Sequence, residues 1–167
     1  HPADSDLDGT GSHGTHVLDI AAGNGRHDGP LGIAPAANLV FVHLAAKGTE
    51  GLANLGDSVR LLEAVDFISH TAGERPWVIN LSVGRHGGPH DGSTLVEQAF
   101  DALLTARPGR AISQSTGNYF DQRIHSCGRL RVGESTSVTI EVDETDKTPN
   151  EIEIWYSGQD AFVLDIR

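Results

Sequence analysis

The sequence predicts an α/β fold: a parallel sheet flanked by helices in three layers, followed by an antiparallel β segment. In the first two thirds of the chain, continuous apolar runs alternate with segments whose apolar residues recur every three or four positions. In the last third, apolar and polar residues alternate with a period of two between polar turns. We therefore expect two domains, over residues 1–119 and 120–167.

The first domain contains three expected strands and the helices between them. The strands are residues 38–44, 77–83 and 110–118, each a short run rich in apolar or small residues. Residues 94–107 read as the helix before the third strand, because apolar side chains fall on one side of it. The helix before the second strand is indicated by apolar residues spaced by three or four: Leu55, Val59, Leu62, Val65 and Ile68.

The second domain is expected to begin a β-rich insertion of the sandwich or jelly-roll type. Residues 136–144, 151–158 and 161–167 alternate between apolar and polar positions, as half-solvated antiparallel strands do. No closing element follows the last of them. The chain also starts at "HPADSD" without a methionine or a leader. We therefore expect the chain to be an internal piece of a longer protein.

Charge and composition exclude several classes of function. Twelve Lys and Arg residues stand against 23 Asp and Glu residues, which gives a net charge of -11. A nucleic-acid backbone would be repelled, so nucleic acid is not expected as a partner. No run of 18 apolar residues predicts a membrane span. The single cysteine, Cys127, excludes an internal disulfide framework.

The stretch "GSHGTH" at 11–16 places a histidine where a helix could begin. At that position the positive end of the helix dipole favours the neutral imidazole of His13, which suits a general base. Two other interpretations stay open. His13 could be satisfied by backbone groups, or His13 and His16, three apart on one helical face, could bind zinc. No cysteine pair or third clustered ligand accompanies them, so no metal site is predicted.

A second metal pattern lies at the start of the chain. In "DSDLDG", Asp4, Asp6, Asp8 and Gly9 reproduce the first half of a calcium-binding loop. The closing position is Thr15 rather than glutamate. A solvated acidic turn accounts better for this segment.

Two strand ends carry further candidate groups, because ligands of parallel sheets gather at the carboxyl edge. "VINLSVG" at 78–84 ends in small residues and could leave backbone amides free to pair with an extended peptide. "STGN" at 115–118 places Asn118 where its carboxamide could donate a hydrogen bond to an oxyanion. Alternatively, the first is an ordinary strand end and Asn118 a turn residue.

In this order, "GSHGTHVLDIAAGNG", "GIAPAANLVFVHL", "VINLSVG" and "STGN" resemble the motifs of the subtilisin-like serine proteases over residues 9–119. The resemblance implies that His13 is the general base, that His16 packs on the same helix, and that Asn118 stabilises the oxyanion. It implies a substrate-binding set of two short segments: Ser82, Val83 and Gly84 in the cleft, and Ser115, Thr116 and Gly117 in the wall of the specificity pocket.

The resemblance is incomplete. The family's aspartate and its nucleophilic serine motif have no counterpart here, since Asp4, Asp6 and Asp8 follow no apolar strand and Ser126 and Ser157 lack the motif. Leu18 and Asp19 also replace a small pair usual in the family. The "QST" before Gly117 stands where small apolar residues are common, which implies a more polar specificity pocket.

The resemblance implies that the parent protein is a bacterial-type serine endopeptidase acting on peptides or proteins, and that this chain alone is inactive. It implies no required cofactor, leaves room for structural calcium, and favours an exported protein. The alternative is a protease-like module with an incomplete triad that binds peptides or regulates. The oligomeric state is not predicted.

Overall fold

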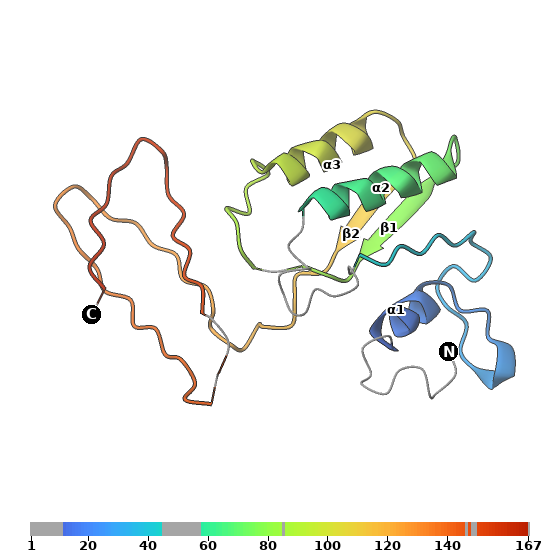
Figure 1. The fold of residues 1–167 in the computed structure, drawn as a ribbon, viewed down its shortest axis with the longest axis horizontal. Helices are drawn as coiled ribbons and strands as arrows, with labels where there is room; N and C mark the ends of the chain where they lie inside the picture. Colours follow the sequence, from blue (N-terminus) through green and yellow to red (C-terminus); the bar gives the residue numbers. More distant parts are fainter. Residues whose placement is uncertain (1–11, 45–57, 85, 146, 148–149, 167) are drawn as a thin grey trace.

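The structure is a computed structural model that describes residues 12–44, 58–84, 86–145, 147 and 150–166 (Figure 1). Leu55 and the acidic stretch with Asp4, Asp6, Asp8 and Gly9 lie outside these residues. The elements follow one another along the chain as α1 (Ser12–Ala22), the 3-10 helix η2 (Arg26–Asp28), α2 (Ser58–Ala72), β1 (Trp77–Leu81), α3 (Leu95–Thr105) and β2 (Arg110–Gln114).

The sheet in the described part of the chain has two parallel strands. β1 pairs with β2 from Trp77 opposite Arg110 to Leu81 opposite Gln114. The chain leaves β1, forms α3 and returns to run beside β1, as a parallel pair requires. The predicted parallel sheet with a helical crossover is therefore confirmed for these two strands, which are shorter than the sequence pattern indicated.

The core lies between one face of the sheet and two helices. Trp77, Ile79 and Leu81 of β1 are buried, whereas Val78 between them is 74% exposed. α2 and α3 lie side by side over the buried face (Figure 1). Their contribution to this core is Val65 together with the partly buried Leu61, Ile68, Ala72, Phe100, Leu103 and Leu104.

The described residues thus form two layers rather than the expected three. The exposure of Val78 shows that nothing in the described chain covers the second face of β1. The continuous apolar run of β1 predicted burial on both faces. In this structure only alternate residues of the run are buried.

α3 begins with a complete capping box. The Thr94 hydroxyl accepts a hydrogen bond from the backbone N–H of Glu97, and the Glu97 carboxylate accepts one from the backbone N–H of Thr94. These two bonds satisfy backbone donors that the first helical turn leaves without partners. They also fix the start of α3 at Leu95, one residue after the start of the helix that the sequence predicted over 94–107.

α1 is held by the loop that follows it. The N–H groups of Ile33 and Ala34 donate to the carbonyls of Ile20 and Ala21, at 3.1 and 2.8 Å. Gly32 precedes these two residues and donates its N–H to the carbonyl of Gly23 at 2.8 Å, and a Cβ atom at 32 would come within 2.6 Å of the backbone nitrogen of Ala22. The loop can therefore approach the end of α1 only because residue 32 is a glycine.

Two groups of predicted strands are absent from the described residues. Residues 38–44 run without ladder pairing, and so do the described parts of the C-terminal segment at 136–144, 151–158 and 161–166. Figure 1 shows the C-terminal segment as long loops beside the helices and sheet. Apolar side chains of the alternating pattern, among them Ile140 and Val142, stay about half exposed. The pattern predicts a strand only where a second layer covers its apolar face, and the described residues provide none.

Among the described residues, none of the helices has the length and hydropathy needed to cross a bilayer.

Candidate functional site

The carboxyl ends of β1 and β2 bring two of the predicted site segments together. Because the strands are parallel, Ser82–Gly84 and Ser115–Gly117 leave the sheet at the same edge. The N–H of Ser115 donates to the carbonyl of Leu81 at 2.9 Å, so the pairing continues one step beyond the strands. The six residues predicted to bind substrate therefore form neighbouring segments.

The side chain of Gln114 links these two segments. Its Nε2 donates to the carbonyl of Val83 at 2.8 Å and to the carbonyl of Ser115 at 2.9 Å. The same nitrogen lies 3.4 Å from the position that a Cβ atom on Gly84 would take. Gln114 is the first residue of the "QST" that departs from the family pattern. The sequence predicted a more polar pocket from it, but not its link between the two segments.

The segment after β1 is also held from its own strand. Nδ2 of Asn80, an exposed residue of β1, donates to the hydroxyl oxygen of Ser82 at 2.8 Å. Ser82 and Val83 are partly buried, and Gly84 is exposed. The backbone of this segment is thus fixed while its outer end stays accessible.

The turn that leads to Asn118 depends on a glycine. The N–H of Gly117 donates to the hydroxyl of Ser115 at 3.2 Å, and Gly117 has a φ of 89°. A Cβ atom at 117 would lie 2.7 Å from Nε2 of His86. Both the left-handed backbone and this close approach favour glycine. The turn leaves Asn118 exposed, where its carboxamide is accessible to a ligand.

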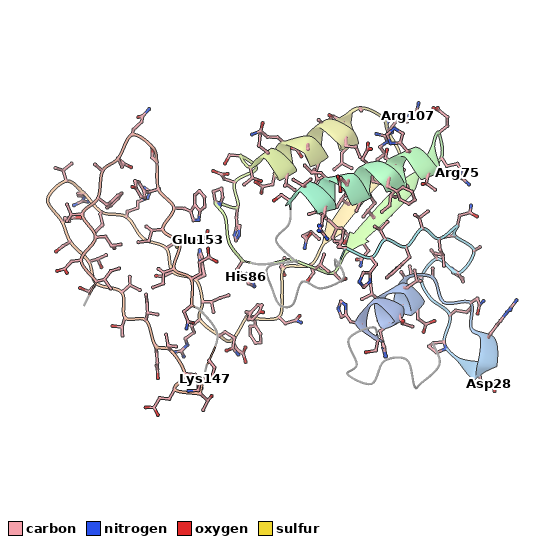
Figure 2. The ribbon with its side chains drawn as sticks, in the orientation of Figure 1. Asp28, Arg75, His86, Arg107, Lys147 and Glu153 are labelled. Atoms are coloured by element: carbon pink, nitrogen blue, oxygen red, sulfur yellow. The ribbon has the colours of Figure 1, made fainter. Side chains whose placement is uncertain are left out.

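His86 lies on the loop after β1, beside this turn, and contacts Tyr119. The two ring centroids are 4.8 Å apart and the ring planes meet at 85°, an edge-to-face arrangement. Figure 2 shows His86 between the sheet and the C-terminal segment. His86 and Tyr119 were not predicted as site residues, because they are far apart in the sequence and only the parallel pairing of the strands brings them together.

These residues border an open hollow of about 290 Å³. The loop after β1 contributes one lining residue, His86. The chain after β2 contributes the others: Thr116, Gly117, Tyr119, Phe120, Arg123, Ile124 and His125. The hollow thus shares Thr116 and Gly117 with the predicted wall of the specificity pocket.

The C-terminal segment touches the loop after β1. The N–H of Gly88 donates to the Glu153 carboxylate at 2.7 Å, and the indole N–H of Trp155 donates to the same oxygen at 2.8 Å. Figure 2 shows Glu153 near His86. This part of the chain was predicted to belong to a separate domain, and its Glu153 nevertheless contacts the loop that carries His86.

His13 and His16 both lie on α1 and both are exposed. His13 is in the first turn of the helix, as predicted, and its neighbour Gly14 faces the ring of Phe41, which lies 3.1 Å from a Cβ atom placed at 14. In the view of Figure 1, α1 lies below the end of β1. Within the described residues, no hydrogen bond or ring contact joins His13 to Asn118.

The described residues contain no group of three or more His, Cys, Asp or Glu side chains close enough to hold a metal ion. Within the described residues, therefore, no third side chain joins His13 and His16 to complete a metal site.

The comparisons with known proteins agree with the resemblance in the motifs. The model of the subtilase family matches residues 1–153. No curated protein and no solved structure shows significant similarity to the chain. The matched range includes all four motifs, the neighbouring segments at the edge of the sheet, and most of the C-terminal segment. The chain belongs to the subtilase family, a family of serine proteases.

Proposed function

We propose that this chain is part of a subtilisin-like serine endopeptidase and carries its general base, its substrate-binding strand end and its oxyanion donor. The observation that supports this most directly is the adjacency of Ser82–Gly84 and Ser115–Gly117 at one edge of the sheet. An extended peptide lying along the first segment would present its side chains to the second.

In the proposed reaction, a serine hydroxyl attacks the peptide carbonyl and His13 takes the hydroxyl proton. His13 then gives this proton to the leaving amine, the C–N bond breaks, and water hydrolyses the acyl-enzyme. The serine and the aspartate that orients the imidazole are proposed to be supplied by residues outside 1–167. His16, one turn further along α1, takes no part.

Asn118 is proposed to stabilise the negative charge that develops on the carbonyl oxygen. It follows a turn fixed by Ser115 and Gly117, and it is exposed. A donor held by such a turn needs little rearrangement when the charge appears, which is why such donors lower the barrier.

The end of β1 is proposed to bind the peptide backbone. The Gln114 side chain uses one acceptor position of the Val83 carbonyl. A carbonyl oxygen has two lone pairs, so Val83 can still accept a bond from a substrate N–H. We further propose peptide or protein substrates, no required cofactor and an exported enzyme.

The experiment compares variants of the full-length protein that contains this chain, with a peptide amide as substrate. His13→Gln is expected to lower kcat by several orders of magnitude, on the order of 10⁶-fold, because triad members act as a unit. His16→Gln, which changes the same side chain on the same exposed helix, is the matched control and is expected to leave kcat unchanged.

Asn118→Ala is expected to lower kcat about 10²–10³-fold with little change in KM, since the donor acts only on the transition state. Equal effects of His13→Gln and His16→Gln would contradict the assignment of the base. A full-length protein that binds peptides without cleaving them would support the alternative, a catalytically incomplete peptide-binding module.

A further inference from the structure

The open hollow beside Asn118 has an unusual lining for this acidic chain. Against a net charge of -11, its lining residues include Arg123, His86 and His125 and no Asp or Glu. The carboxylate that is nearest in sequence, Asp121, is not in the lining and accepts a hydrogen bond from Nε2 of Gln122 at 3.1 Å. Glu153, which lies near His86, is not in the lining either, and its carboxylate accepts hydrogen bonds from Gly88 and Trp155. The lining itself therefore holds cationic and N–H donor groups and no carboxylate.

These three basic side chains are also without charged partners. In the part of the chain that the structure describes, no ion pair or hydrogen bond engages Arg123, His86 or His125. By contrast, Arg107 forms an ion pair with Glu74 at 2.7 Å, and Arg75 donates to carbonyls at the end of α2. A guanidinium without a carboxylate beside a pocket is free to bind a carboxylate from a ligand.

The hollow is next to the position of the proposed reaction. Thr116 and Gly117 line it, and Asn118 is the following residue. If Asn118 holds the oxygen of the scissile carbonyl, the side chain on that carbonyl's residue lies within reach of 116 and 117. The hollow has a volume of about 290 Å³ and so has room for such a side chain.

The walls of the hollow suit a short acidic side chain. Tyr119 and Phe120 provide apolar surface for methylene groups, and the ring of His86 contacts Tyr119 edge to face. Gly117 permits the approach of His86, because a Cβ atom there would be 2.7 Å from its Nε2. A basic side chain would be repelled by Arg123, whereas an apolar one would gain nothing from the exposed donors.

We infer that this hollow is a specificity pocket for an acidic side chain, glutamate or aspartate, immediately before the scissile bond, with Arg123 binding its carboxylate. The inference rests on the proposed function, because it uses Asn118 as the oxyanion donor. Arg123 acts here as a specificity residue, and His86 and His125 supply further N–H donors.

The test uses the full-length protein and C-terminally amidated peptides that differ only at the residue before the scissile bond: Glu, Gln, Leu or Lys. Amidation removes the C-terminal carboxylate, which could otherwise bind Arg123 in place of the side-chain carboxylate. Two quantities are measured, kcat/KM for hydrolysis and, by calorimetry, the affinity for the amidated peptides that end at that residue. The Glu peptide is expected to exceed the Gln peptide by at least about tenfold in both.

Variants assign this preference to the hollow. Arg123→Gln is expected to abolish the difference between the Glu and Gln peptides, and Arg123→Lys, which keeps the charge, to retain part of it. Arg129→Gln is the matched control: it removes the same charge from an exposed position outside the hollow and is expected to leave the preference intact.

The outcomes separate this inference from the proposed function. Hydrolysis that depends on His13 but favours Leu or Gln, or a Glu preference that survives Arg123→Gln, overturns the inference alone. A Glu preference in binding that depends on Arg123, without hydrolysis, supports the hollow and overturns the proposed protease. If no peptide binds or is cleaved, both are wrong.

Discussion

The imidazole of His86 meets the ring of Tyr119 edge to face, with the centroids 4.8 Å apart, across the turn that leads to Asn118. His86 comes from the loop after β1 and Tyr119 from the segment after β2. The contact ties the two chain segments that leave the carboxyl edge of the sheet. A Cβ atom on Gly117 would lie 2.7 Å from Nε2 of His86 and 3.3 Å from the ring of Tyr119.

Gly117→Ala is expected to disrupt this arrangement. The new Cβ atom would start 2.7 Å from Nε2 of His86, and the φ of 89° would be strained for alanine. We expect weaker peptide binding by the full-length protein, measured by calorimetry. Two alanine controls separate the causes: Gly128 has no neighbour within 4 Å and no left-handed φ, whereas Gly133 has a φ of 84° but also no neighbour within 4 Å.

If the crowding at His86 matters, Gly117→Ala reduces binding more than Gly133→Ala does. Equal binding by all three variants would show that the turn does not shape the site.

Ile79→Ala is expected to lower the free energy of unfolding by about 2–5 kcal/mol, because it removes methylene groups from the packed face of β1. Ile79 is only 4% exposed and lies in the cluster with Val65, Trp77 and Leu81. Val78→Ala, the adjacent position, is the control: Val78 is 74% exposed, and its change is expected to be within about 0.5 kcal/mol. Urea denaturation measures both. Similar losses for the two variants would mean that a further layer covers the second face.

Thr94→Ala is expected to lower the free energy of unfolding by about 1 kcal/mol, because α3 loses its N-cap hydroxyl. Thr94→Ser keeps the hydroxyl and is expected to retain most of the stability. Chemical denaturation of the two variants side by side measures the difference. If serine is as harmful as alanine, the hydroxyl is not the stabilising group.

The same capping box predicts a dependence of stability on pH. The hydroxyl and then the backbone N–H of Thr94 donate to Glu97 and hold the pKa of its carboxyl below the ordinary value of 4.5. The folded state therefore favours the charged carboxylate. Its contribution to stability is complete above the unfolded-state pKa and is lost as the pH falls through the lower folded-state pKa. Stability measured from pH 7 down to about pH 3 is expected to decline less in Glu97→Gln than in the unchanged protein. Parallel declines would exclude this contribution.

The elements that the sequence predicted well have strong local patterns. α2 and α3 repeat apolar residues every three or four positions, and α3 also carries its capping box in the sequence as Thr94 and Glu97. β1 and β2 are short apolar or small-residue runs on either side of α3, so their parallel pairing followed from the crossover. The adjacency of the two predicted substrate-binding segments came with it.

The elements that failed depend on contacts with distant parts of the chain. Residues 38–44 and the alternating segments after 136 have the composition of strands, but a strand exists only with a hydrogen-bonding partner. The alternation of apolar and polar residues does not show whether the described chain supplies a partner strand. His86 and Arg123 were missed for a similar reason: neither sits in a motif, and the hollow arises where two loops meet.

The central claim is that His13 activates a serine from outside residues 1–167. The most direct measurement is labelling by a fluorophosphonate probe followed by peptide mapping. In the full-length protein we expect one labelled serine outside 1–167, with labelling lost in His13→Gln and kept in His16→Gln, and we expect no labelling of the isolated chain. A labelled serine within residues 1–167, or labelling unchanged in His13→Gln, would contradict the account.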